Sequence, residues 1–236
     1  SEGSLMQGVI PVLLREGHEV VGVDNLFRYG EVERDRPYEF IRGDLVDREF
    51  VMEVVAGTDG VIQAAARIFG VGGFHKYPAD ILSNDLVLHQ NVLWAALEHH
   101  VPKVAYIGSS MVYERCAVNP SAEDDAFDSL VPSTDYGLMK LVGERLSRAF
   151  SEQYGLKYVV WRPFNIITPF EEGEDEQGIS HVFADFVRMI VLEKQNPMPI
   201  LGDGKQVRCF TWIDDVAEII GKWTFDDRTD GRTYNL

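Results

Sequence analysis

The stretch Val104-Ala105-Tyr106-Ile107-Gly108-Ser109-Ser110-Met111-Val112-Tyr113 joins a short apolar run directly to a pair of hydroxyl side chains. The run 104–108 has the length and the β-branched content of a buried strand, and its glycine marks a turn. Ser109 and Ser110 then stand just past the carboxyl end of that strand, where ligands bind in open parallel sheets. Hydroxyls at this place could bind a substrate, or they could only satisfy backbone groups of the turn.

Strand and helix patterns alternate on both sides of this stretch. Strands are expected at 20–24, 38–44, 60–66 and 158–162, with helices at 86–99 and 136–154. Parallel strands joined by helix-length connections need cover on both faces of their sheet. The sequence therefore predicts an α/β protein with a Rossmann-like, doubly wound parallel sheet.

The pattern changes after Pro163. An acidic loop at 171–176 precedes an expected helix at 181–194, a turn-rich segment at 195–204 and a strand at 207–212. We expect this later third to form a small lobe over the ligand edge of the sheet. The predicted organisation is a nucleotide-binding domain at 1–163 and a partial substrate-binding lobe at 164–236, interleaved with the sheet.

The amino-acid composition argues against several classes of function. The chain has 236 residues, with 22 Lys and Arg against 38 Asp and Glu, a net charge of −16. Such a charge argues against nucleic-acid or anionic-membrane binding, since both need a basic face. Two cysteines, Cys116 and Cys209, are too few for a disulfide framework or a thiolate zinc site, and no metal site is expected. No apolar run approaches the ~20 residues of a membrane helix and no basic leader is present, so we expect a cytoplasmic protein.

Tyr136 and Lys140 lie four residues apart on the predicted helix 136–154, hence on one face of it. A lysine ammonium beside a phenol favours the tyrosinate and lowers the pKa of the tyrosine from its usual ~10. Such a tyrosine serves as a general acid or base near neutral pH. Tyr136 and Lys140 alone could be a surface pair without a function. The presence of Ser109 upstream favours a catalytic role for them.

Seven motifs in chain order carry a resemblance to a known family. They are Val23-Asp24-Asn25, Gly43-Asp44-Leu45, 109–113, the Tyr136/Lys140 pair, Arg162-Pro163-Phe164-Asn165, Gly202-Asp203-Gly204 with Arg208, and Asp214-Asp215-Val216. The chain resembles an extended short-chain dehydrogenase/reductase of the NAD-dependent epimerase/dehydratase group, which acts on nucleotide sugars. The resemblance runs from Gly17 to Leu236.

The resemblance implies NAD as cofactor. Asp24 would accept hydrogen bonds from the adenosine ribose and repel a 2′-phosphate, which favours NAD over NADP. Asp44 and Leu45 would flank the adenine, and Lys140 would also hold the nicotinamide ribose. The implied cofactor-binding residues are Gly3, Asp24, Asn25, Asp44, Leu45, Ala64, Ala65, Ala66, Tyr136 and Lys140. For either aspartate alone, capping of a turn is the simpler interpretation.

The resemblance also implies a UDP- or GDP-linked nucleotide sugar as substrate and a homodimer as the assembly. The implied substrate-binding residues are Ser109, Ser110, Asn165 and Arg208, the last because a guanidinium suits diphosphate oxygens. Tyr136 would take the sugar hydroxyl proton while hydride passes to NAD⁺, with Ser109 assisting and Lys140 supporting. The hydride would then return to the other face of the transient keto sugar.

Three alternatives to this epimerase remain open. The chain could be a catalytically silent relative that binds a nucleotide sugar, a dehydratase or reductase of the same family, or an interaction protein that uses an exposed sheet edge. Dehydratases of the family carry an Asp-Glu pair where this chain has Ser110 and Met111, and the family's 3,5-epimerases carry a cysteine where Met111 stands. Both differences favour simple 4-epimerisation.

The beginning of the chain departs from the family pattern. The family opens with a strand and three glycines at GxxGxxG spacing, before a helix whose N-terminus cradles the pyrophosphate. The aligned positions here are Ser1, Gly3 and Met6, no first strand precedes them, and Pro11 falls inside the expected helix. We expect a family member cut at both ends, with unpaired strand edges beside the absent first strand.

Overall fold

The computed structural model describes residues 1–176 and 178–236, so that Gln177 lies outside the described part. Its strands are β1 Val21–Asp24, β2 Glu39–Arg42, β3 Val61–Gln63, β4 Lys103–Ile107, β5 Lys157–Arg162, β6 Ile166–Ile167, β7 Thr211–Trp212 and β8 Arg232–Asn235. Every strand pair is parallel. Strands form where the sequence predicts them up to β5, and the parallel α/β fold is confirmed.

The sheet is divided. Strands β3, β4, β5 and β8 form one four-stranded sheet in that order, whereas β1 and β2 pair only with each other. Within the described residues no strand joins β1 to β3, and Val21 of β1 is among the exposed large apolar residues. The sequence predicts unpaired strand edges at this place, and the structure shows them.

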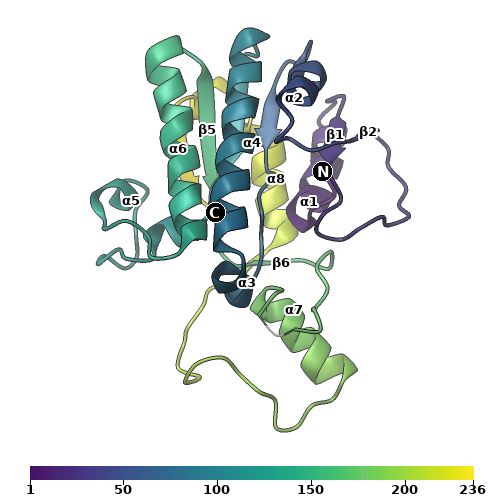
Figure 1. Ribbon diagram of the computed structural model, residues 1–236, viewed down its shortest axis with the longest axis vertical. Coiled ribbons are helices and arrows are strands. Elements are labelled where there is room, and N and C mark those ends of the chain that lie inside the picture. The colour runs from purple at the N-terminus through teal and green to yellow at the C-terminus, as the bar shows by residue number, and fades with distance from the viewer. Residues whose placement is uncertain (177) are drawn as a thin grey trace.

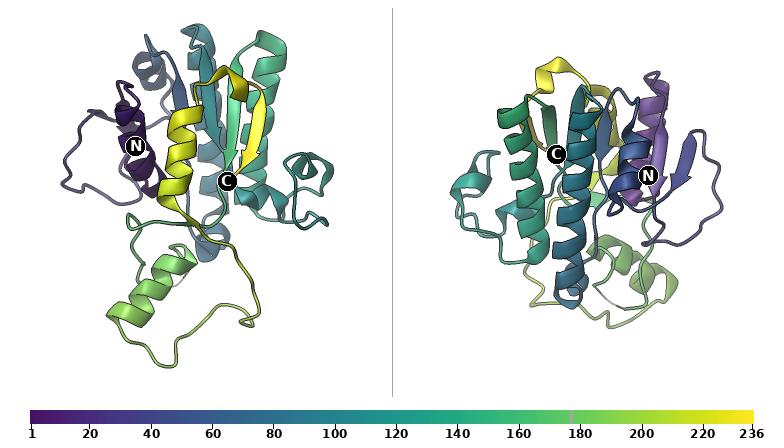
Figure 2. Two further views of the ribbon diagram at one scale, coloured as in Figure 1. Left: turned by 180° about the vertical axis from the view of Figure 1, so that it is seen from behind. Right: turned by 45° about the horizontal axis from the view of Figure 1, so that its top comes forward.

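Helices cover both faces of the strands. They are α1 Ser4–Arg15, α2 Arg48–Val55, α3 Val71–Lys76, α4 Pro78–Glu98, α5 Asp125–Asp128, α6 Asp135–Tyr154, α7 Val182–Phe186 and α8 Ile213–Trp223. Helices α2, α4 and α6 lie on one face, and α1 packs with α8 on the other (Figures 1 and 2). The core has a cluster on each side, one around Val9, Trp161 and Ile220 and one around Val51, Val92 and Val104.

Local signals in the sequence set the ends of helix α6, which carries the predicted catalytic pair. The Oγ1 atom of Thr134 accepts a hydrogen bond from the backbone N–H of Gly137 at 3.1 Å, which caps the first turn. Gly155 ends the helix with φ of 76°, a left-handed conformation that favours glycine. Tyr136 and Lys140 are therefore held in the first two turns of a well-capped helix.

The later third differs from its prediction. The expected helix 181–194 is the five-residue α7 followed by a π-helical turn at Val187–Leu192, and the expected strand 207–212 is reduced to the two residues of β7. Val207 is 84% exposed and has no neighbouring strand to pair with in the described residues, so its β-branched pattern is not enough to make a strand. Segment 164–212 lies beyond the carboxyl ends of the strands, and α8 and β8 return to the sheet (Figure 1).

Pro11 lies inside α1, as the sequence predicts, and the structure shows that it is exposed. Proline removes one helical hydrogen bond and crowds the preceding turn. We expect Pro11→Ala to raise the free energy of unfolding, measured by urea denaturation, by about 1–3 kcal/mol. A Glu53→Ala change at an exposed position of α2 should shift it by less than about 0.5 kcal/mol. Equal or lower stability of Pro11→Ala would contradict this expectation.

Within the described residues, no helix combines the length and the apolar character that crossing a membrane requires.

Candidate functional site

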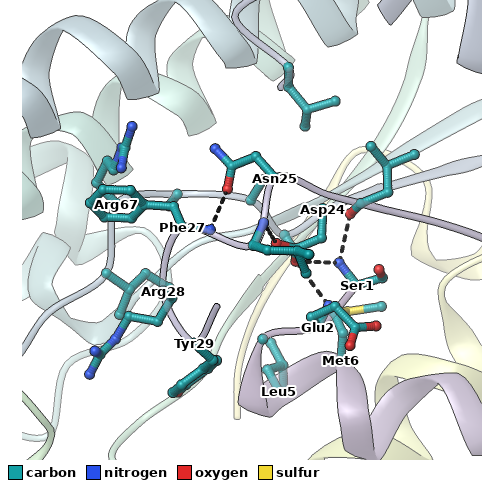
Figure 3. A pocket seen from close by; sticks show the side chains of 18 of the residues that line it. Ser1, Glu2, Leu5, Met6, Asp24, Asn25, Phe27, Arg28, Tyr29 and Arg67 are labelled. Carbon is teal, nitrogen blue, oxygen red and sulfur yellow. Dashed lines mark hydrogen bonds and ion pairs between the residues drawn. The ribbon is translucent and has the colours of Figure 1, made fainter. Parts of the chain in front are cut away.

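A cavity of about 190 Å³ lies at the carboxyl ends of β1 and β3, beside the N-terminus of α1 (Figure 3). Eight of the predicted cofactor-binding residues line it: Gly3, Asp24, Asn25, Asp44, Leu45, Ala64, Ala65 and Ala66. These residues come from four separate segments of the chain. The structure therefore gathers a set that the sequence could only associate through a resemblance.

Asp24 stands at the end of β1 and faces the start of the chain (Figure 3). Its Oδ2 atom accepts hydrogen bonds from the backbone nitrogen of Ser1 at 3.1 Å and from the N–H of Glu2 at 2.9 Å, and its Oδ1 accepts from the N–H of Leu26 at 2.8 Å. Burial raises the pKa of Asp24, whereas the backbone N–H groups of Glu2 and Leu26 lower it by hydrogen bonding to the carboxylate. Asp24 is thus an anion on the cavity wall, and it also caps a local turn.

Two of the predicted motifs meet directly. The amide of Asn25 donates to Oδ2 of Asp44 at 2.9 Å, which links the end of β1 to the end of β2. The other oxygen of Asp44 accepts from the N–H of Val46 at 3.1 Å. The carboxylates of Asp24 and Asp44 therefore each serve both a local turn and the cavity.

The N-terminus of α1 borders the cavity without a side-chain cap, because its N-cap residue is Gly3. Uncapped N–H groups at a helix start suit an anion such as a phosphate. The buried carboxylate of Glu2 lies next to this helix start. Arg36 compensates its charge and donates to both of its oxygens at 3.2 and 3.0 Å, and the hydroxyl of Tyr38 donates to it at 2.7 Å. Burial raises the pKa of Glu2, and these partners lower it below its usual value.

Two arginines of the cavity wall carried no motif in the sequence. Arg28 pairs through Nη1 with Glu174, and its Nη2 is buried with no hydrogen-bond partner in the described part of the chain. The guanidinium of Arg67 lies 3.5 Å from the ring centroid of Phe27 (Figure 3). An unpaired guanidinium donor on a cavity wall suits a phosphate oxygen. The sequence contains no motif that marks Arg28 or Arg67. They are suggested only by the general rule that nearby cations hold a phosphate.

These residues fit a dinucleotide. Asp24 offers a carboxylate for ribose hydroxyls, Arg28 and the start of α1 offer donors for phosphates, and Ala64 to Ala66 leave room for close approach of the backbone. The fit is between the hydrogen-bonding groups of a dinucleotide and the donors and acceptors that line the cavity.

The three predicted catalytic residues come together next to this cavity. Ser109 caps the 3₁₀ turn Ser110–Tyr113 by accepting from the N–H of Met111 at 3.1 Å, and its hydroxyl also interacts with that of Tyr136, which lowers the pKa of the phenol. The Nζ atom of Lys140 donates to the backbone oxygen of Ile107 at 2.8 Å and lies 5.7 Å from the ring centroid of Tyr136. Ile107 itself lines the cavity, so the cluster borders the same edge of the sheet.

The prediction that Lys140 lowers the pKa of Tyr136 is wrong for this conformation. The ring of Tyr136 stacks on Phe74 of α3 at 4.6 Å with 7° between the planes, and both side chains are buried. Burial raises the pKa of Tyr136 well above its usual value, and the interaction with Ser109 opposes this only in part. Burial also lowers the pKa of Lys140 to about 8. Removal from water is therefore the main cause of both pKa shifts.

The predicted substrate-binding residues are less concentrated. Ser110 is half-buried beside Ser109, whereas Asn165 is exposed, has a φ of 38° and donates its amide to the backbone oxygen of Cys209 at 3.0 Å. Arg208 lies exposed on the loop before β7, with a weak 3.4 Å contact to Gln206. None of the four lines the cavity. Their roles stay predictions.

Comparison with known proteins identifies the class. Residues 3–236 match the NAD dependent epimerase/dehydratase family. The chain belongs to this family, whose cofactor is NAD.

Two relatives and one solved structure illustrate the similarity. The chain is 28% identical to GDP-L-fucose synthase of Escherichia coli, over 74% of this chain and 56% of that one. It is 28% identical to UDP-glucose 4-epimerase of Halalkalibacterium halodurans, over 88% of this chain and 62% of that one. It shares its fold with the Thermus thermophilus UDP-glucose 4-epimerase solved with NAD, at a TM-score of 0.83 and 24% identity, over all of this chain and 75% of that one. The chain spans about half the length of the first curated relatives it matches.

Proposed function

We propose that this chain carries out NAD-dependent epimerisation of a nucleotide sugar at C4 of the sugar, through a transient keto intermediate. The observation that carries the proposal is the cluster of Ser109, Tyr136 and Lys140 beside a cavity lined by the residues for a dinucleotide. Relatives named as epimerases support the choice of reaction.

NAD, when bound, supplies the hydride acceptor for oxidation of a sugar carbinol. The role of Tyr136 is to accept the proton of the sugar hydroxyl and to return it at the end of the cycle. The hydroxyl of Ser109 interacts with that of Tyr136 and orients that proton transfer. Lys140, anchored on Ile107, supplies the positive charge that favours a tyrosinate once the ring is exposed to substrate.

Substrate binding is assigned on chemistry. Arg208 and Asn165 would hold the diphosphate and the sugar, and Ser110 the sugar hydroxyls, as parts of a substrate lobe at 164–236 that faces the domain 1–163. The relatives named for UDP-glucose and GDP-L-fucose support a UDP- or GDP-linked sugar. A homodimer is part of the same proposal.

The buried position of Tyr136 favours one second candidate, a silent relative that binds a nucleotide sugar without turnover. Phe74 covers the ring of Tyr136, so an active enzyme requires α3 to move aside when substrate binds. A silent protein has no such requirement.

The reaction can be tested in D₂O with UDP-glucose and substoichiometric NAD, followed by proton NMR. We expect UDP-galactose to form with its C4 hydrogen retained, because the hydride returns from the cofactor within one cycle. Deuterium at C3 or C5 would instead indicate 3,5-epimerisation. In a separate incubation with excess NADH, stoichiometric oxidation of the NADH with reduction of the nucleotide sugar would indicate a reductase. Both results would contradict the proposal.

Cofactor binding is measured in parallel by quenching of the fluorescence of the four tryptophans. Saturable quenching by NAD without turnover of UDP- or GDP-linked hexoses would support the silent relative. Absence of quenching at millimolar NAD would contradict cofactor use by this chain.

A further inference from the structure

The short helix α3 is the element that covers Tyr136, because it carries Phe74, whose ring stacks on that tyrosine at 4.6 Å. Tyr136 is only 7% exposed under this cover. The two rings share one buried apolar cluster with Phe69, Ile81 and Met139. The contacts that hold α3 in place therefore decide how accessible Tyr136 is.

The chain can bend where α3 meets α4. Tyr77 separates the two helices with φ of −125° and ψ of 42°, outside the α-helical region, and Pro78 begins α4. A residue before proline is disfavoured in the helical conformation, so α3 does not continue into α4 as one rigid rod. Helix α3 can therefore turn about this junction while α4 stays packed against α6.

Two backbone hydrogen bonds fasten the start of α3 to the later third of the chain. The N–H of Gly70 donates to the backbone oxygen of Ile179 at 2.7 Å, and the N–H of Gly72 donates to that of Gly178 at 2.9 Å. Ile179 also packs against the apolar cluster around Phe74. These contacts place α3 next to α7 beyond the carboxyl ends of the strands (Figure 1).

The contact at Gly70 is too close for a side chain. A Cβ atom at this position would lie 2.2 Å from the backbone oxygen of Ser180 and 2.4 Å from that of Gly178. The backbone of Gly70 is extended, with φ of −73° and ψ of −177°, a conformation that alanine also adopts. A methyl group here would therefore push the two segments apart without straining the backbone of α3.

A buried carboxylate fixes the other side of this contact. Asp185 of α7 is 3% exposed, and its Oδ2 accepts from the N–H of Gly178 at 2.8 Å while its Oδ1 accepts from the hydroxyl of Ser180 at 2.6 Å. The Oγ atom of Ser180 in turn accepts from the N–H of Glu174 at 3.0 Å. Hydrogen bonds to a carboxylate are stronger than those between neutral groups, so Asp185 holds the backbone on which α3 rests.

We propose that α3 is a gate over Tyr136, and that Asp185 is the positioning residue of a latch that holds the gate shut. The latch is the contact of Gly70 and Gly72 with residues 178–180. When the latch opens, α3 turns about its junction with α4 and the ring of Tyr136 becomes accessible. The later third of the chain thereby controls access to the acid–base residue. The link to sugar turnover rests on the proposed function, whereas the gate and its latch do not.

Gly70→Ala tests the gate through nitration of tyrosines by tetranitromethane, mapped by mass spectrometry. Nitration of Tyr136 should be at least about tenfold faster than in the unmodified chain, because breaking the latch raises the population of the open gate. Tyr154, exposed at the other end of α6, is the internal reference and should react at an unchanged rate. A smaller increase at Tyr136 overturns the proposal.

Asp185→Ala tests the latch by amide hydrogen exchange, and it decides the matter if Gly70→Ala does not fold. The amides of Gly70 and Gly72 should exchange at least about tenfold faster, while that of Val92 in the buried part of α4 keeps its rate. Glu172→Ala, which removes an exposed carboxylate from the neighbouring loop, should change none of these rates. Unchanged exchange at the two glycines, or equal acceleration in α4, would indicate a purely structural role and overturn the proposal.

Turnover separates this proposal from the proposed function. Faster nitration of Tyr136 in both variants, with no conversion of a nucleotide sugar by any of the chains, would support the gate and refute the proposed function alone. Faster exchange at Gly70 and Gly72 without faster nitration of Tyr136 would show that the latch does not control access to the tyrosine, and would overturn the gate.

Discussion

Tyr136→Phe is expected to lower the turnover of a nucleotide sugar by about 10²–10⁴-fold, because it removes the group that accepts and returns the substrate proton. Its effect on NAD binding should be small, since the substitution keeps the ring that stacks on Phe74. The hydroxyl interacts with Ser109, which lowers the pKa of the phenol, and its removal leaves the stacked ring in place. Steady-state rates and tryptophan quenching by NAD measure the two quantities separately.

Tyr154→Phe provides the matched control. It makes the same chemical change at the exposed end of the same helix α6 and should leave turnover and NAD binding unchanged. If Tyr136→Phe retains turnover within about tenfold of the unmodified chain, Tyr136 is not the acid–base group, since that role carries about a hundredfold or more.

The second large effect concerns stability. Glu144→Gln should lower the free energy of unfolding by about 3–5 kcal/mol, because it leaves the guanidinium of Arg162 buried without its counter-charge. Both side chains are within 1% of full burial and join through two hydrogen bonds. The remaining contacts of Arg162, to the hydroxyl of Tyr113 and the backbone oxygen of Glu123, carry no formal charge to replace it.

Urea denaturation with Glu152→Gln as control tests this expectation. Glu152 pairs with Arg148 on the exposed side of the same helix, and its loss should cost less than about 0.5 kcal/mol. A double change, Glu144→Leu with Arg162→Met, removes both buried charges and should recover most of the lost stability. Equal costs for Glu144→Gln and Glu152→Gln would show that burial does not strengthen the pair.

The alternation of strands and helices could be predicted from the sequence because it depends on local periodicity. Strands β1, β2, β4 and β5 and helix α6 form within a few residues of their predicted bounds. The later third was less readable. Val207 has a strand-like sequence but finds no partner, and strand formation depends on that partner.

The candidate site also contains some residues that the sequence could predict and others that it could not. The pairing of Tyr136 with Lys140 follows from helical spacing, and the place of Ser109 follows from the end of β4. Asp85 and Arg28 have no such signal, because what marks them is a buried polar atom that residues far away in the described part of the chain leave unpaired.

The sequence by itself predicted the parallel α/β fold, the family and the residues proposed for acid–base chemistry, because the motifs that carry them are local in the chain. Only the tertiary structure decided that Phe74 covers Tyr136, and that Asp85 and Arg28 each have one buried polar atom unpaired in the described part of the chain. The physical reason is that strand pairing, burial and charge compensation are set by residues that approach each other only when the chain folds. The pKa of Tyr136 illustrates this, because helical spacing predicted its decrease and burial raises it.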